Sequence, residues 1–176
     1  MKRRRPTAPA PLAEKKVNAR MGFELEAEVL RLLAERRQTL ALAESCTGGG
    51  MAHRLTNVPG ASAAFLGGVV AYSNPVKRKF LGVRAKTLAS HGAVSEAVAR
   101  EMAEGARAKF GADFALGITG IAGPAGGTKG KPVGTVFIAL AGPSGTLVER
   151  KLNAGDRMAF KEVTVQQALA WLLAQL

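Results

Sequence analysis

The spacing of apolar residues along the chain predicts several amphipathic helices. Leu25, Val29, Leu32 and Leu33 fall at positions i, i+4, i+7 and i+8, which places them on one face of a helix that begins near Phe23. Another helix is expected between the cap residue Ser95 and Gly111, and a last one after Asp156. Shorter helices are predicted at residues 51–55 and 75–81.

Short apolar runs between these helices predict strands at residues 39–43, 65–72, 114–119, 133–141 and 146–152. The sequence Gly-Pro-Ser-Gly at 142–145 predicts a hairpin between the last two. Gly67 and Gly68 lie inside the second run and predict a close approach of another backbone. Helices alternate with strands, two strands then pair, and a helix closes the chain. This order favours a three-layer α/β/α sandwich with a mixed, mostly parallel sheet.

Charge separates the first twenty residues from the rest of the chain. The net charge is +12, and residues 1–20 contribute half of it in a Lys/Arg-rich and Pro-rich stretch that cannot form an apolar helix face. We therefore expect a disordered tail at 1–20 and one domain at 21–176. A basic tail can attract nucleic acid or anionic lipid through phosphate contacts, and a merely solvated tail is the alternative.

Composition excludes several classes of protein. No apolar run reaches the roughly 18 residues of a membrane span, and no stretch resembles a signal peptide, so we expect a cytoplasmic protein. A single cysteine, Cys46, excludes an internal disulfide, and two histidines argue against a structural zinc site. Neither P-loop spacing nor G-x-G-x-x-G occurs in the glycine-rich segments, so an ATPase or a dinucleotide dehydrogenase is not supported.

Three candidate motifs begin where predicted strands end, at Ser45, Tyr72 and Thr119. Ligands of such sheets bind at the carboxyl ends of strands. The segment after Ser45 continues through Cys46 and Thr47 into three glycines, which leaves N–H groups at a helix start that favour a phosphate or a developing oxyanion. Ser45 is a candidate nucleophile, and helix capping by Ser45 or Thr47 is the alternative. Cys46 is either a second nucleophile or an inert buried thiol.

A nucleophilic serine needs a base. His53 lies about two helical turns beyond Ser45, and His91 is expected in a surface turn, so Lys77 is the more interesting candidate if burial lowers its pKa. A solvated helix face is the alternative for Lys77. Tyr72, the only tyrosine, could orient a base or bind substrate, or it could be a half-buried core residue.

Two further positions could contact a ligand. Thr119 opens the sequence Thr-Gly-Ile-Ala-Gly-Pro, where its hydroxyl could bind a ligand or form a local turn. Arg157 follows the helix-capping Asp156 and could pair with a phosphate or lie in water.

Taken together, the motifs resemble those of the CinA C-terminal domain family. The resemblance runs from about Gly22 to Leu176 and keeps the order of the motifs, which are AESCTGG at 43–49, VPGAS at 58–62, YSN at 72–74 with Lys77, HGAVS at 91–95, TGIAGP at 119–124, GTV at 134–136 and GDR at 155–157. It implies an α/β/α fold that commonly forms a homodimer. It also implies a metal-free, cofactor-free amidase that converts nicotinamide mononucleotide to nicotinate mononucleotide and ammonia. Many relatives carry a larger nucleotide-processing domain before this one, and we expect the stand-alone amidase form here.

The resemblance also implies roles for individual residues. Ser45 corresponds to the nucleophile and Lys77 to its base, with Tyr72 assisting. N–H groups around Thr47 and Gly48 would stabilise the oxyanion. The expected substrate contacts are Thr47, Gly48, Gly49, Thr119, Gly120 and Arg157. The alternative is a catalytically silent nucleotide-binding module that acts as a sensor or partner subunit. Association with nucleic acid is expected only through the basic tail, and association with a membrane is not expected.

Overall fold

The computed structural model describes residues 24–176, so the tail predicted at 1–20 lies outside the described residues. All predicted helices and strands are present in it, with small shifts of their ends. In chain order they are α2 (Glu24–Glu35), β1 (Leu40–Glu44), α3 (Gly50–Thr56), the 3-10 turn η1 (Ala61–Ala63), β2 (Phe65–Val70), α4 (Asn74–Leu81), α5 (Ala85–His91), α6 (Glu96–Phe110), β3 (Phe114–Gly120), β4 (Thr135–Gly142), β5 (Gly145–Leu152) and α7 (Arg157–Gln175). Helix α5 was not predicted: His91, expected in a surface turn, is its last residue.

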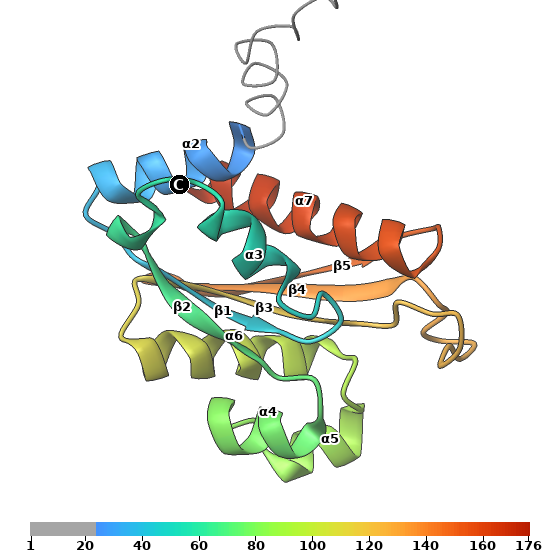
Figure 1. The fold of residues 1–176 in the computed structure, drawn as a ribbon. Coiled ribbons are helices and arrows are strands. Elements are labelled where there is room, and N and C mark those ends of the chain that lie inside the picture. The colour runs from blue at the N-terminus through green and yellow to red at the C-terminus, as the bar shows by residue number, and fades with distance from the viewer. Residues whose placement is uncertain (1–23) are drawn as a thin grey trace, which may run out of the picture.

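The strands form one mixed sheet in the order β2-β1-β3-β4-β5. Strand β1 is parallel to both β2 and β3, whereas β4 is antiparallel to β3 and β5, so only β4 runs against the other strands. Helices α2, α3 and α7 cover one face of the sheet, and α4, α5 and α6 lie on the other (Figure 1). The expected three-layer α/β/α architecture is confirmed. Among residues 24–176, no helix combines the length and the apolar composition of a membrane span.

The two faces of the sheet pack against their helices differently. On β1, Leu40 and Leu42 join the large apolar core beneath α2, α3 and α7, whereas Ala41 and Ala43 point toward α6. A Cβ atom at Gly117 of β3 would lie 2.5 Å from the carbonyl oxygen of Ala99, so α6 packs directly onto the strand backbone. Small residues on this face therefore allow the close approach that a glycine-rich composition favours.

The expected local signals are also present at the helix and strand ends. The Ser95 side chain accepts from Val98 N–H at the start of α6, and Asp156 accepts from two N–H groups at the start of α7. The hairpin pairs Gly142 with Gly145. At Gly68 a Cβ would lie 2.8 Å from that of Leu42, which confirms the predicted close approach of β2 and β1.

The order of the strands creates a crevice at one end of the sheet. From β1 the chain crosses to β2 through α3 on one face, and then from β2 to β3 on the far side of β1 through α4, α5 and α6 on the other. The chain that leaves β1 thus turns toward β2, whereas the chain that leaves β3 turns the other way, toward β4. In open α/β sheets such a switch point is where ligands bind, and β1 ends here directly before Ser45.

Candidate active site

Ser45 is held at the end of β1 by backbone hydrogen bonds on two sides. Its N–H donates to the Ile118 carbonyl at 3.0 Å, which extends the ladder between β1 and β3 by one residue. Its carbonyl accepts from Gly48 N–H at 3.1 Å and closes a tight turn. The Ser45 residue is 8% exposed. Its side chain is therefore fixed at the edge of the crevice and not at the tip of a mobile loop.

The start of α3 is occupied by a carboxylate of the chain itself. The buried Glu44 side chain accepts hydrogen bonds from the N–H groups of Gly49, Met51 and Ala52, at 2.9–3.1 Å. The expectation of free N–H groups at this helix start is therefore wrong for these three residues. The alternative, capping by Ser45 or Thr47, is also wrong, because Glu44 supplies the capping oxygens and the Thr47 hydroxyl is buried without a partner among residues 24–176.

Lys77 provides the second group of the site. Helix α4 begins four residues after β2 and has Pro75 in its first turn. Lys77, one turn into the helix, points toward the interior. Lys77 is 1% exposed, and its Nζ donates to the Ser45 hydroxyl at 2.9 Å and to the Ala71 carbonyl at 2.7 Å. The solvated helix face considered as the alternative is therefore wrong for this lysine.

Burial changes the acid–base behaviour of Lys77. Loss of hydration disfavours the ammonium form and lowers the pKa of Lys77 below its ordinary value. Neither of its two hydrogen-bond partners carries a charge that would restore that form. A neutral amine at this place can donate one N–H to Ala71 and direct its lone pair at the Ser45 hydroxyl. The pair can thus activate a serine for attack on a carbonyl carbon.

Around this pair lies a cavity of about 190 Å³. Its lining residues come from the end of β3, from the segments that follow β1, β2 and β3, from α4, from the connection between α5 and α6, and from the start of α7. They are Ser45, Cys46, Tyr72, Asn74, Lys77, Ala93, Val94, Thr119, Gly120, Ala122 and Arg157. The structure thus brings six of the nine predicted site residues together. Thr47, Gly48 and Gly49 are outside the lining. Asn74, the first residue of α4, was quoted in the YSN motif at 72–74 but was not named as a site residue.

Tyr72 and Arg157 both line the cavity and are hydrogen-bonded to each other. The Arg157 guanidinium donates through Nη2 to the Tyr72 hydroxyl at 2.6 Å and through Nη1 to the Gly123 carbonyl at 3.0 Å. Tyr72 is 60% exposed, so the alternative of a half-buried core tyrosine is wrong. The bridge links the end of β2 to the first residue of α7, which are far apart in the sequence.

Thr119 supports a wall of the cavity. Its buried hydroxyl donates to the Ala93 carbonyl at 2.9 Å and ties the connection between α5 and α6 to β3. Because Ala93 and Val94 line the cavity, this bond shapes it. At Gly120, a Cβ would lie 2.8 Å from the Thr135 carbonyl oxygen and 3.1 Å from the Cys46 sulfur, so the space tolerates only glycine.

The other nucleophile and base candidates do not fit the chemistry. Burial raises the pKa of the Cys46 thiol to about 12, so its nucleophilic thiolate form is scarce at neutral pH. His53 is exposed on α3 beside Asn57, and His91 is exposed at the end of α5. Neither histidine lines the cavity. Within residues 24–176, no group of three His, Cys, Asp or Glu side chains is arranged to hold a metal ion.

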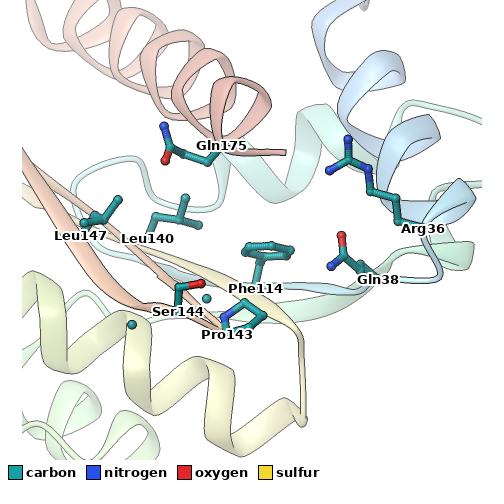
Figure 2. A pocket seen from close by; sticks show the side chains of 10 residues that line it. Arg36, Gln38, Phe114, Leu140, Pro143, Ser144, Leu147 and Gln175 are labelled. Atoms are coloured by element: carbon teal, nitrogen blue, oxygen red, sulfur yellow. The ribbon is translucent and has the colours of Figure 1, made fainter.

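A larger cavity, of about 380 Å³, lies at the opposite end of the strands (Figure 2). Figure 2 shows Arg36 and Gln38 entering it from the connection between α2 and β1, and Ser144 from the β4–β5 turn. Phe114, Leu140 and Leu147 supply apolar surface. This cavity contains a serine and a cation, but no hydrogen bond joins them among the described residues.

The fold and the site define an α/β/α domain in which a serine at the switch point is hydrogen-bonded to a buried lysine. A family model described as the CinA C-terminal domain matches residues 23–176. The chain belongs to this family, as the order of its motifs predicted.

Relatives agree with this assignment. The chain is 57% identical over 146 residues to a CinA-like protein of Anaeromyxobacter sp. (strain Fw109-5), a match that covers 83% of this chain and 36% of the relative. This chain therefore spans about a third of the length of such curated relatives. Among solved structures, the competence damage-inducible protein A (ComA) of Klebsiella pneumoniae superposes with a TM-score of 0.84 at 45% identity, covering 86% of this chain and 94% of that one. A CinA superfamily protein of Escherichia coli gives a TM-score of 0.85 at 36% identity, over 88% and 90% of the two chains.

Proposed function

We propose that this chain is an amidase that hydrolyses the carboxamide of nicotinamide mononucleotide to nicotinate mononucleotide and ammonia. The observation that carries the proposal is the 2.9 Å hydrogen bond between the Ser45 hydroxyl and the amine of Lys77, a lysine that is only 1% exposed. Maintaining a buried lysine costs stability, because the ammonium form loses its hydration. A role of the Lys77 amine as the base for Ser45 would explain why the fold keeps a buried lysine despite this loss of stability. The substrate class rests on the resemblance to the family.

In the first half of the reaction, Ser45 Oγ attacks the carboxamide carbon and its proton moves to Lys77 Nζ. The tetrahedral intermediate then collapses: the carbon–nitrogen bond breaks and the proton passes from Lys77 to the departing nitrogen, which leaves as ammonia. An ester between Ser45 and the nicotinoyl group remains. Lys77 thus ends this step neutral, as it began, and is ready to act again.

The second half repeats the sequence with water. A water molecule gives a proton to Lys77 and attacks the ester carbon, and Ser45 Oγ takes the proton back as it leaves. The product is nicotinate mononucleotide, whose new carboxyl group releases its proton to solvent and leaves as the carboxylate. The Ala71 carbonyl, 2.7 Å from Lys77 Nζ, orients the amine in both halves.

Backbone N–H groups after the serine are suited to the oxyanion. Gly48 N–H donates to Ser45, and Gly49 N–H to Glu44, so both are occupied. In contrast, the N–H groups of Cys46 and Thr47 donate to no backbone carbonyl in the described part of the chain, and Cys46 lines the cavity. Among these groups we therefore assign the oxyanion to the N–H of Cys46, the residue of this segment that lines the cavity next to Ser45. Loss of one oxyanion donor typically costs about 10²–10³ in rate.

Ammonia release from nicotinamide mononucleotide tests the proposal directly. We expect release by the natural sequence in the presence of a metal chelator, and a loss of at least about 10³-fold in Ser45→Ala. Ser144→Ala, in the cavity at the other end of the sheet, is the matched control and should retain full activity. Equal activity of Ser45→Ala and the natural sequence would remove Ser45 from the nucleophile role. Nucleotide binding without ammonia release would favour the silent binding module.

A further inference from the structure

The cavity beside Ser45 cannot enclose a whole mononucleotide. Its volume is about 190 Å³, below the roughly 300–1,000 Å³ of typical ligand sites. It suits the ring that carries the carboxamide, and the ribose and phosphate must then lie outside it. We propose that the ammonium group of Lys161 binds the phosphate of the nucleotide above the backbone of Gly48. This inference rests on the proposed function and deepens it, because it names the residue that distinguishes a nucleotide from its unphosphorylated nucleoside.

Helix α7 places Lys161 next to the cavity. Arg157, the first residue of α7, lines the cavity, and Lys161 follows it by four positions. Residues four apart lie on the same helix face, about 6 Å apart along the axis. Lys161 is therefore the next side chain on the face that borders the site.

The glycines after Ser45 leave room beneath this lysine. The position that a Cβ would take at Gly48 is 3.5 Å from Lys161 Nζ, so the ammonium lies directly above the bare backbone. At Gly49 the same position is 3.4 Å from Val70 Cγ2 of β2. The two glycines thus lie between Val70 and Lys161. Gly48 also belongs to the turn that closes onto the Ser45 carbonyl, so a phosphate there stays within one nucleotide's length of the serine.

Of the three cations at or next to the cavity, Arg157, Lys77 and Lys161, the first two already have hydrogen-bond partners. Arg157 donates to Tyr72 and Gly123, and Lys77 donates to Ser45 and Ala71. Lys161 makes no hydrogen bond or ion pair within residues 24–176, so a phosphate can bind it without displacing a partner. The sequence left open whether Arg157 pairs with a phosphate or lies in water; because its guanidinium already donates to Tyr72 and Gly123, it is better suited to hold Tyr72 in place.

The nearby carboxylates do not neutralise Lys161. Glu44 is buried and accepts three N–H groups at the start of α3. Asp156 accepts from Met158 and Ala159 N–H at the start of α7. Glu162, the next residue on α7, is exposed. None of these carboxylates forms an ion pair with Lys161 in the described part of the chain, so a dianionic phosphate can bind its ammonium group without breaking one.

Steady-state kinetics with nicotinamide mononucleotide and nicotinamide riboside test this assignment. We expect Lys161→Ala to raise KM for the mononucleotide about 10- to 100-fold, because a charge-assisted bond is lost, with little change in kcat. KM for the riboside should not change, and Lys161→Arg should retain most of the affinity. Lys109→Ala, an exposed lysine of α6 on the opposite face, controls for the loss of one charge. An equal effect of Lys161→Ala on both substrates, or none on either, would overturn the assignment.

Equilibrium binding separates this inference from the proposed reaction. If the natural sequence binds the mononucleotide but releases no ammonia, the amidase proposal fails. Calorimetric titration of both ligands then still tests Lys161: a weaker affinity of Lys161→Ala for the mononucleotide alone supports the phosphate site. If the natural sequence neither binds nor hydrolyses the mononucleotide, the phosphate site is overturned as well.

Discussion

The two ends of the sheet each carry a cavity with a serine and a cation, yet only one has the geometry of a catalytic site. At the carboxyl ends of β1 and β3 the cavity is small, about 190 Å³, and Ser45 contacts Lys77. At the amino ends the cavity is twice as large, about 380 Å³, and is bordered by Ser144 and Arg36 (Figure 2). Cavity size therefore does not identify the reactive end of this molecule.

The difference lies in the burial of the cation. The exposed cation at the larger cavity is Arg36. An arginine guanidinium in a protein does not act as a base, so it cannot accept a proton from a serine. Lys77 is buried with uncharged partners, and its lowered pKa makes a neutral amine accessible. A serine becomes a nucleophile only beside such a base.

Among changes to the two cations, the largest effect is expected when Lys77 is made apolar. Lys77→Met should lower the amidase rate by about 10²–10⁴-fold, because the serine loses its base. The protein should remain folded, since a side chain of similar length replaces a buried amine. Circular dichroism and thermal unfolding check the fold, and ammonia release checks the activity. The matched variant Arg36→Met, at the other end of the sheet, should keep its activity; a comparable loss there would erase the contrast between the two cavities.

The pH dependence of activity also tests whether buried Lys77, unlike exposed Arg36, acts as a base. Because burial lowers the pKa of Lys77, kcat/KM should rise with pH through an inflection below the ordinary pKa of lysine and then level off. An activity independent of pH across this range would contradict the role of Lys77 as the base.

Stability should follow pH in the same direction. Between the lowered pKa of folded Lys77 and its ordinary value, the unfolded chain binds more protons than the folded one. The free energy of unfolding of the natural sequence should therefore rise with pH relative to Lys77→Met across this window. The difference in Tm between the two proteins, followed from neutral pH upward, measures it; a constant difference would argue against a shifted lysine.

A smaller effect is expected at the cavity wall. Thr119→Val removes the hydroxyl that holds the Ala93 carbonyl and should cost about 1 kcal/mol of unfolding free energy, with a loss of activity smaller than that of Lys77→Met. Thr47→Val is the matched control, because the Thr47 hydroxyl is equally buried but has no partner among the described residues. It should be neutral or stabilising. Denaturant unfolding compares the two, and equal costs would show that the bond to Ala93 is unimportant.

Local patterns were sufficient for most of the fold. Apolar periodicity located α2 and α7, the side chains of Ser95 and Asp156 marked two helix starts, and the turn at 142–145 marked the hairpin. Helix α5 was missed because it lacks an apolar stripe. Thr87 is its only buried residue, and its hydroxyl donates to Glu101 of α6 at 2.7 Å. The feature that marks this helix is therefore a tertiary contact with α6, which the local sequence does not reveal.

The capping of α3 was missed for a similar reason. Glu44 is the last residue of β1, and its carboxylate reaches N–H groups five to eight residues ahead, beyond the spacing of the familiar capping motifs. Only the tight turn through Ser45 and Gly48 brings them together. This turn also explains why N–H groups that appeared free in the sequence are occupied in the fold.

The sequence by itself determined which residues stand at the ends of strands, because strand and helix periods are local properties of the chain. It therefore placed Ser45, Tyr72 and Thr119 at one end of a sheet. The local pattern did not pair Lys77 with Ser45, which only the family resemblance implied; tertiary structure brings these two together across 32 positions, and Arg157 and Tyr72 across 85. The proton affinity of a lysine depends on how completely water is removed from it. That quantity is set by the packing of α4 against the sheet and appears nowhere in the local pattern of residues.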